Sequence, residues 1–325
     1  MKALLCKAWG GPEDLVLEEV DTPLPGEGEI VIDVHAAGLN FPDLLMISGQ
    51  YQFKPPFPFS PGMEVGGTVS ALGPGVDRFA IGDRVMGSTG QGGLAEQALC
   101  EVDKTYALPE GVSFAQAAGF PVTYGTTYYA LKERAQLKPG EVLLVHGAAG
   151  GVGLNAVELG KRMGATVVAT VGSDDKMRVV KKYGADFVFN YSKERIRDVV
   201  KGVTQDRGAD VIYDPGGGDA FDESLRCINW EGRLLVIGFA SGRIPEAKAN
   251  LILLKSCQVV GVFWGAWIKR EPEEARAQFA TLLDWTAAGE LKPHISLRLP
   301  LDRTLEGYEA IRGRKTTGKV IIEVR

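Results

Sequence analysis

The sequence has few of the residues that build metal centres and disulfide frameworks. Its 325 residues include only four cysteines and three histidines. The cysteines are Cys6, Cys100, Cys227 and Cys257. They lie far apart and never form a CxxC pair, whereas zinc sites and disulfide frameworks need closer, patterned spacing. We therefore expect four reduced thiols and no bound metal. With only three histidines, few catalytic mechanisms that use an imidazole group are open to this protein.

Strong charge of one sign and long apolar runs are also missing. The chain has 36 Lys and Arg against 41 Asp and Glu, a net charge of -5, so nothing indicates a nucleic acid or an anionic membrane surface as partner. No apolar run reaches the roughly 20 residues that a membrane helix needs. The apolar stretch within MKALLCKAWGGPEDL is too short for a signal peptide. We expect a cytoplasmic protein with neither nucleic acid nor membrane as partner.

Glycine, by contrast, is abundant, with 42 residues, and one cluster stands out. In EVLLVHGAAGGVGLNAVELGKRMGA (residues 141–165), an apolar run precedes the cluster and a helix-like segment follows it. Ala148, Gly150 and Gly153 occupy the three small positions of a GxGxxG-type turn, with Ala in place of the first Gly. A phosphate at such a turn meets unpaired N–H groups and the positive end of a helix dipole. Glycine-rich turns are common, but the order strand, turn, helix favours a dinucleotide site over a mere turn.

The pattern of apolar residues divides the chain into two regions. Residues 1–120 contain short segments, such as 15–20 and 29–38, in which apolar and polar residues alternate, as in half-buried strands. From residue 141, six strand-like runs alternate with helical ones, which is typical of a doubly wound parallel sheet. The chain ends in KVIIEVR, a strand that we expect to join the N-terminal sheet. We predict an α/β fold with a β-rich domain at 1–120 and 266–325 and a dinucleotide-binding domain at 121–265.

The end of the second strand of that sheet indicates which nicotinamide cofactor binds. An acidic residue at this point bonds the ribose of NAD, but here the strand ends in Val-Gly-Ser at 171–173 without a carboxylate. The end leaves room for a 2′-phosphate, which Ser173, Lys176 and, from the next strand, Tyr191 can contact. The two acids at 174–175 argue against a 2′-phosphate site, unless they lie in the first turn of a helix that Ser173 caps, which is the interpretation we prefer. Lys176 could also lie on a solvent-exposed helix face. We favour NADP over NAD.

Five motifs along the chain together resemble one family. They are AAGLNFPD (36–43), PGMEVGG (61–67), GDRV (82–85), YGTTYYAL (124–131) and HGAAGGVG (146–153). The combination is similar to that of the zinc-free, zeta-crystallin-like NADPH:quinone oxidoreductases of the medium-chain dehydrogenase/reductase superfamily, from MKALL to TTGKVIIEV. The resemblance implies a GroES-like catalytic domain, a Rossmann domain that binds NADPH, and a homodimer joined through the Rossmann edge strand. The segment LILLKSCQVVGVFWG (251–265) would supply that edge.

Zinc-dependent relatives carry Cys and His ligands within the first two motifs. This chain has Leu39-Asn40-Phe41 and Met63-Glu64 there instead. Zn²⁺ needs thiolate, imidazole or carboxylate ligands, and Glu64 alone cannot hold it. The sequence therefore predicts a zinc-independent protein.

The resemblance also implies roles for individual residues. The residues expected at the catalytic cleft are Asn40, Asp43, Tyr51 and Thr126, of which Asn40 and Thr126 would lie beside the nicotinamide. The other residues expected to contact the cofactor are Ala149, Gly150, Gly151, Val152, Gly172, Ser173, Lys176, Tyr191, Pro215, Gly216, Gly238, Phe239, Val262, Phe263, Trp264 and Lys319. Ordinary packing is the competing interpretation for each, and it is strongest for Phe239, Val262 and Trp264.

The activity that the resemblance implies is hydride transfer from NADPH to a quinone. The cofactor carries the chemistry, and a quinone can take its protons from water, so no dedicated general acid is required. We interpret His146, just before the glycines, as a residue packed in the core. The first alternative is reduction of an activated C=C bond in an enone, alkenal or enoyl thioester, which needs a proton donor, for which Tyr51 is the candidate. The second is a non-catalytic NADPH-binding structural or sensor protein. Family membership places quinone reduction first.

Overall fold

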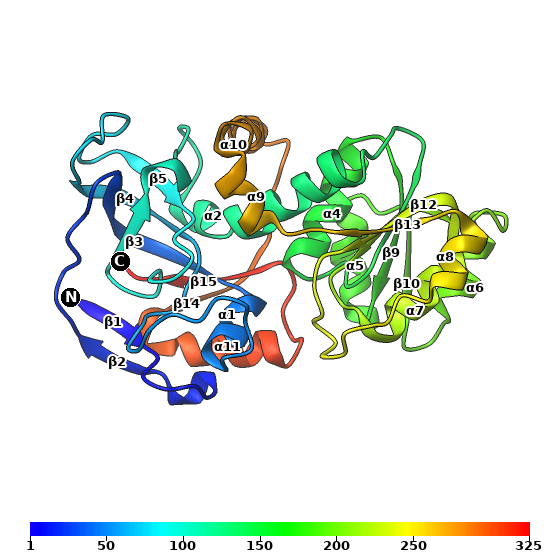
Figure 1. Cartoon of the computed structure of the whole chain (residues 1–325), viewed down its shortest axis with the longest axis horizontal. Coiled ribbons are helices and arrows are strands. Elements are labelled where there is room, and N and C mark those ends of the chain that lie inside the picture. Colours follow the sequence, from blue (N-terminus) through cyan, green and yellow to red (C-terminus); the bar gives the residue numbers. More distant parts are fainter. The chain divides into compact units, whose positions relative to one another are not determined.

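The computed structural model describes all residues, Met1–Arg325, and the chain divides into two compact units (Figure 1). Unit 1 comprises Met1–Gly125 and Ile268–Arg325, and unit 2 comprises Thr126–Trp267. The C-terminal strand pairs with the N-terminal sheet of unit 1, as the sequence predicts. No helix has both the length and the apolar character needed to cross a membrane.

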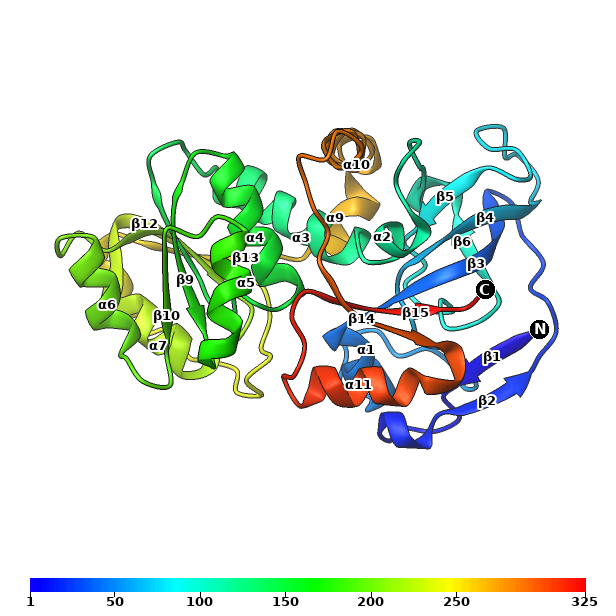
Figure 2. The same cartoon turned by 180° about the vertical axis from the view of Figure 1, so that it is seen from behind.

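Unit 1 is built on a sheet that is antiparallel except for the parallel pair β14 and β15. Its strands are β1 (Lys2–Leu5), β2 (Val16–Glu19), β3 (Glu29–Leu39), β4 (Val65–Leu72), β5 (Arg84–Gly87), β6 (Gln97–Glu101), β7 (Thr105–Ala107), β14 (Ile295–Pro300) and β15 (Lys319–Glu323). The main sheet has the order β14-β15-β3-β4-β5-β7, with β6 also paired to β3, while β1 and β2 form a separate pair. Its helices are α1 (Phe41–Ile47), α2 (Phe114–Ala118), α10 (Pro272–Ala287) and α11 (Thr304–Arg312). Helix α11 lies along β14 and β15 (Figure 2).

Strand β3 is the centre of unit 1 because it pairs with β15, β4 and β6. Ile30, Ile32 and Val34 are fully buried in the core. At the carboxyl end of β3 the sheet and α2 approach closely. A Cβ on Gly38 would lie 2.1 Å from the carbonyl oxygen of Ala118, so no larger residue fits there.

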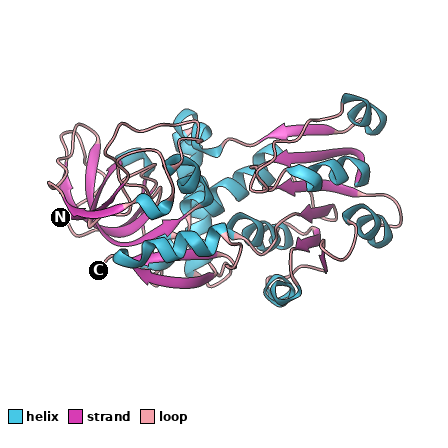
Figure 3. Ribbon diagram, turned by 90° about the horizontal axis from the view of Figure 1, so that it is seen from below, coloured by secondary structure: helices cyan, strands magenta, loops and turns pink.

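Unit 2 contains a six-stranded parallel sheet. Its strands are β8 (Val142–Val145), β9 (Thr166–Val171), β10 (Phe187–Asn190), β11 (Ala209–Asp214), β12 (Ile228–Val236) and β13 (Gln258–Gly261). Its helices are α3 (Thr126–Tyr128), α4 (Gly151–Arg162), α5 (Met177–Lys182), α6 (Ile196–Val203), α7 (Gly218–Cys227) and α8 (Ala249–Lys255), followed by α9 (Trp264–Arg270), which runs on into unit 1. Helices lie on both sides of the sheet (Figure 3).

The strand order of unit 2 is β10-β9-β8-β11-β12-β13. This is the 3-2-1-4-5-6 order of a Rossmann sheet, so the predicted doubly wound fold is confirmed. Leu143, Leu144 and Val145 are all fully buried, because helices cover both faces of a parallel sheet. The chain order reverses between β8 and β11, which is where such sheets bind ligands.

Candidate functional site

The glycine turn connects β8 to α4, as the sequence predicts. Gly150 is the N-cap residue of α4, with φ -75° and ψ 175°. A Cβ on Gly153 would lie 2.3 Å from the carbonyl oxygen of Gly147, so the third small position is required by the turn itself. A Cβ on Gly150 would meet nothing closer than that same oxygen, at 3.4 Å. Since the protein leaves space beside Gly150, a small residue there suits the close approach of a ligand to the backbone.

Several predicted cofactor residues follow the carboxyl ends of parallel strands and so gather at one edge of the sheet. They are Gly172 and Ser173 after β9, Tyr191 after β10, Pro215 and Gly216 after β11, Gly238 and Phe239 after β12, and Val262, Phe263 and Trp264 after β13. The residues Phe239 and Phe263 are 38% and 55% exposed, which argues against the interpretation that they pack in the core. Trp264, at 7%, is buried and fits the packing interpretation.

Asp214 holds the loop after β11. This buried carboxylate accepts hydrogen bonds through Oδ1 from the backbone N–H groups of Gly216 and Gly217, both at 2.9 Å. Gly217 has φ +65°, a conformation that favours glycine. The sequence analysis did not single out Asp214. The sequence does contain a signal for it, because Asp214 ends an apolar strand and is followed by a run of glycines.

The corner between β9 and β10 holds the residues predicted to meet a 2′-phosphate. A Cβ on Gly172 would lie 2.7 Å from the hydroxyl of Tyr191, so glycine lets this ring lie against the end of β9. Ser173 occupies the N-cap position of a short 3₁₀ turn, but its side chain makes no capping hydrogen bond, contrary to expectation.

Asp174 is held at this corner by residues at and just after the end of β10. It accepts a hydrogen bond from Asn190 Nδ2 at 2.7 Å and forms an exposed ion pair with Lys193. These contacts lower the pKa of Asp174, the Lys193 hydrogen bond most. The sequence analysis treated Asp174 as a first-turn helix acid and missed both partners.

His146 is a packed core residue, as expected. Its Nε2 lies 2.7 Å from Ser224 Oγ, and its Nδ1 lies 3.4 Å from Thr170 Oγ1. Ser224 donates its only proton to the carbonyl oxygen of Ala220, at 2.7 Å, so His146 Nε2 carries the proton that Ser224 accepts. Burial lowers the pKa of His146, which keeps the ring neutral.

Thr127, the neighbour of the predicted site residue Thr126, fastens α3 to the glycine turn within unit 2. Its hydroxyl lies 2.9 Å from that of Tyr213 and donates to the carbonyl oxygen of Val152 at 3.3 Å. Thr126 is only partly buried.

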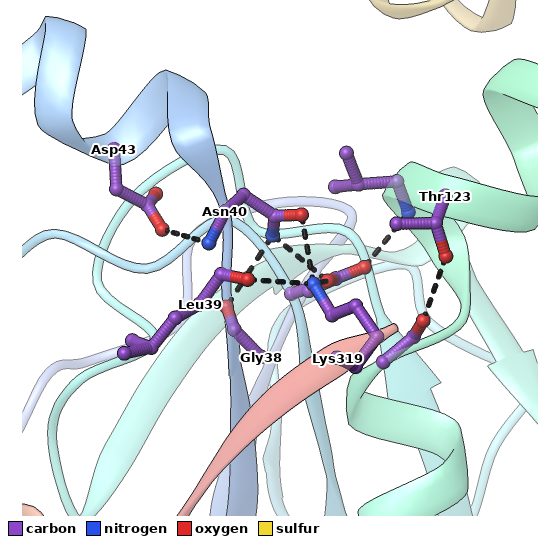
Figure 4. Close-up of polar contacts among 9 residues, drawn as sticks. Gly38, Leu39, Asn40, Asp43, Thr123 and Lys319 are labelled. Atoms are coloured by element: carbon purple, nitrogen blue, oxygen red, sulfur yellow. Dashed lines mark hydrogen bonds and ion pairs between the residues drawn. The ribbon is translucent and has the colours of Figure 1, made fainter. Parts of the chain in front are cut away.

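In unit 1, a buried polar cluster joins Asn40, Glu64 and Lys319 (Figure 4). Lys319 Nζ donates to Glu64 Oε1 at 2.7 Å, to Asn40 Oδ1 at 2.8 Å and to the carbonyl oxygen of Leu39 at 2.7 Å. Asn40 Nδ2 donates to the same Glu64 oxygen at 2.8 Å. The structure therefore brings two predicted site residues, Asn40 and Lys319, together on a carboxylate that the sequence analysis considered only as a zinc ligand.

Asp43 extends this cluster along α1. Its Oδ2 accepts the backbone N–H of Asn40 at 2.8 Å, while Oδ1 has no hydrogen-bond partner. Complete burial raises the pKa of Asp43 to about 7. The pKa of half-buried Tyr51 is raised by burial and then by Asp43. The sequence analysis missed Tyr308, a buried phenol that lies close to Asp43 without good hydrogen-bonding geometry and whose pKa is raised mainly by burial.

The residues of this cluster do not fit a zinc ion. No group of three or more His, Cys, Asp and Glu side chains is arranged to hold a metal. Glu64 is the one carboxylate of the first two motifs that bonds the side chain of Asn40, and its Oε1 is occupied by the Lys319 ammonium. A fixed cation therefore lies between the two motifs in which zinc-dependent relatives carry their ligands.

Comparison with known proteins places the whole chain in one family. Residues 26–125 match the alcohol dehydrogenase GroES-like domain, and residues 151–287 match the family described as zinc-binding dehydrogenase. The chain is 39% identical to quinone oxidoreductase-like protein 2 homolog of Nematostella vectensis, over 100% of this chain and 89% of that protein. It is 35% identical to quinone oxidoreductase of Homo sapiens, over 99% and 97% of the two chains.

Solved structures agree with these relatives. The Escherichia coli quinone oxidoreductase complexed with NADPH superposes with a TM-score of 0.95 at 31% identity, over 100% of both chains. A mycobacterial protein complexed with NADPH gives a TM-score of 0.94, also at 31% identity and 100% of both chains. The antiparallel unit is thus the GroES-like domain and the parallel unit the Rossmann domain. The chain belongs to the quinone oxidoreductase family of the medium-chain dehydrogenase/reductase superfamily.

Proposed function

We propose that this protein reduces quinones with NADPH and without a metal ion. The observation that carries the proposal is the full-length match to a quinone oxidoreductase whose structure holds NADPH. When bound, the nicotinamide supplies a hydride to the quinone, which takes up a proton from water to give the hydroquinone. The glycine turn supports cofactor binding, since space beside Gly150 and the N-terminus of α4 suit a pyrophosphate.

The proposed cofactor site uses the carboxyl edge of the Rossmann sheet. Ala149 through Val152 would hold the pyrophosphate, and Gly172, Ser173, Lys176 and Tyr191 would frame the 2′-phosphate. The absence of a carboxylate at 171–173 supports NADPH over NADH. Asp174 is the nearest acid, and it is tied to Lys193 and Asn190.

For the proposed reaction site, Asn40, Asp43, Tyr51 and Thr126 would lie toward the nicotinamide and the acceptor. Asp43 has no exposed surface, so its contribution is to hold the backbone of Asn40 rather than to meet the acceptor. Tyr51 is partly exposed and its raised pKa keeps the phenol protonated at neutral pH.

The partly exposed phenol of Tyr51 is the observation that favours a second candidate function, reduction of an activated C=C bond. Such a reaction delivers the hydride to the β-carbon and needs a proton at the α-carbon. The phenol of Tyr51 carries a proton and is partly exposed, so it can supply that proton. A Tyr51→Phe variant separates the two reactions: quinone reduction should persist, whereas enone reduction should fall by about 10² or more.

We also propose a homodimer formed through the edge of the Rossmann sheet. Strand β13 is the last strand of that sheet, and an unpaired edge invites a partner strand. Leu253 and Leu254 on the preceding helix are 79% and 70% exposed. Light scattering should give the mass of two chains, and Leu253→Lys with Leu254→Lys should lower it to one.

A cytoplasmic location is proposed from the thiols. All four cysteines are free and buried, which suits a reducing compartment.

The test of the function is a screen of NADPH oxidation against ortho- and para-quinones, enones and enoyl-CoA esters. We expect the highest kcat/KM with a quinone, and faster turnover with NADPH than with NADH. An enoyl ester preferred over every quinone would replace the first function by the second. NADPH binding without turnover on any acceptor would instead indicate a structural or sensor protein.

A further inference from the structure

The ammonium group of Lys319 has no donor left for a ligand. A lysine ammonium carries three N–H donors, and here they meet Leu39 O, Asn40 Oδ1 and Glu64 Oε1 at 2.7, 2.8 and 2.7 Å. The side chain is 7% exposed and the partner carboxylate 0%. Contact between Lys319 and a cofactor would require one of these bonds to be given up.

The carboxamide of Asn40 is held between the two charges. Nδ2 donates one proton to Glu64 Oε1 at 2.8 Å and the other to the carbonyl oxygen of Gly38 at 3.3 Å. Oδ1 accepts one proton from Lys319 and keeps one lone pair. A 180° turn of the amide would face NH₂ to the ammonium and oxygen to the carboxylate. Both contacts would then be repulsive, so the charges select one orientation.

Glu64 anchors this arrangement to a third element. Its Oε2 accepts the backbone N–H of Val122 at 2.7 Å, at the start of the π-helical turn Pro121–Gly125. The carboxylate has little freedom, because even a Cβ on Gly38 would lie 2.6 Å from Oε1. The ion pair is thus fixed to the end of β3, the start of β15 and the turn at 121–125.

Stability alone does not account for such a pair. Buried ion pairs can often be replaced by apolar residues at no loss of stability, and their best-attested use is to specify one arrangement among several. The arrangement specified here is that of Asn40.

We infer that Lys319 and Glu64 are positioning residues that fix the carboxamide of Asn40 so that only its Oδ1, as an acceptor, is available to a bound hydroxyl or N–H group. The inference rests on the proposed function, in which Asn40 lies at the reaction site. It assigns Lys319 an action through Asn40 rather than a direct contact with the cofactor.

A double-mutant cycle tests this coupling. The neutral pair Lys319→Met with Glu64→Gln leaves no lone buried charge, and it should lower kcat/KM with NADPH and a quinone about 10²-fold, as small misplacements of site groups do. Asn40→Ala should cause a similar loss. In the Asn40→Ala background, the neutral pair should lower kcat/KM by less than about threefold further. Losses that multiply would show that the ion pair does not act through Asn40 and would overturn the inference.

A matched control separates this effect from general destabilisation. Arg233 and Glu141 form another largely buried pair, with side chains 16% and 18% exposed, joined by two hydrogen bonds of 2.9 and 2.7 Å. Glu141 precedes β8 and so lies at the sheet edge opposite the glycine turn. Arg233→Met with Glu141→Gln should leave kcat/KM within about threefold of the wild type. A loss as large as that of the Lys319 variant would contradict a specific role for the Lys319 pair.

A spectroscopic readout does not depend on turnover. The side-chain NH₂ of Asn40, assigned in ¹⁵N spectra by its absence from Asn40→Ala, should exchange slowly in the wild type and rapidly in the neutral-pair variant. Rapid exchange in the wild type would overturn the inference even if quinone reduction is observed. Slow exchange without any quinone turnover would instead remove the proposed function and leave the fixed orientation standing.

Discussion

Most residues predicted for the cofactor site in unit 2 follow the ends of parallel strands, whereas the Asn40 cluster of unit 1 consists of buried side chains held by charge. The glycine turn works through its backbone, and its requirements are steric: no side chain at Gly153, and free space at Gly150. The Asn40 cluster works through two opposite charges that are hidden from solvent. The first kind of site depends on the space around its backbone, whereas the second is strongly destabilised when one charged partner is removed.

The largest effect should come from breaking the charge balance of unit 1. Lys319→Met leaves Glu64 buried without its cation, so we expect the free energy of unfolding to fall by about 3–5 kcal/mol. Adding Glu64→Gln should restore most of it. Chemical denaturation measures both variants, and a double variant no more stable than Lys319→Met would show that the lone charge is not the cause.

The steric requirements of unit 2 should give a smaller effect. Gly153→Ala forces a Cβ against the Gly147 oxygen, so we expect a loss of about 1–3 kcal/mol in the free energy of unfolding. Gly150→Ala is the matched control: its stability should change by less than about 0.5 kcal/mol. Its dissociation constant for NADPH should nevertheless rise at least about tenfold, measured by cofactor fluorescence. If Gly150→Ala bound NADPH normally, the free space beside it would not serve the cofactor.

Burial of Asp43 makes the stability of unit 1 depend on pH. Its pKa is about 7 in the folded protein against 3.8 for the ordinary group. Between these values folded Asp43 holds a proton that unfolded Asp43 has released, so the contribution of Asp43 to stability is greatest at acid pH and falls as pH rises toward 7. The slope that Asp43 adds to the free energy of unfolding approaches about 1.4 kcal/mol per pH unit. Asp43→Asn should remove this slope between pH 4.5 and 6.5. An unchanged slope would show that Asp43 does not hold the proton.

The smallest effect should come from the corner between β9 and β10, where the 2′-phosphate is predicted to bind. Lys176→Ala should raise the KM for NADPH by about tenfold, as expected for one hydrogen bond to a charged group. The KM for NADH should barely change, since NADH lacks the 2′-phosphate. Lys181 is a basic residue of α5, the helix that follows Lys176, and Lys181→Ala should affect neither value. Equal effects of Lys176→Ala on both cofactors would contradict the 2′-phosphate assignment.

The same contrast explains what the sequence could and could not predict. Gly150 and the strand before it were recognised because a backbone turn leaves a local pattern of small residues. The Rossmann order followed from alternating strands and helices. The link between Glu64 and Lys319 spans 255 positions in the chain, and no local pattern records it. Tyr308 was missed for the same reason, since its neighbour Asp43 belongs to a distant segment.

The contacts of Asp174 at the corner between β9 and β10 were not predicted, for a different reason. Asp174 resembled an ordinary first-turn acid, and only the parallel pairing of β9 with β10 brings it to Asn190 and Lys193. Such contacts depend on which strands are neighbours. They become predictable once the strand order is known.

The most direct test is the rate of NADPH oxidation by the wild-type protein with a quinone, in the presence of a strong metal chelator. We expect turnover that the chelator does not change, a higher kcat/KM for NADPH than for NADH, and a quinone as the best acceptor. Loss of turnover on chelation, or faster reduction of an enoyl ester than of any quinone, would contradict it.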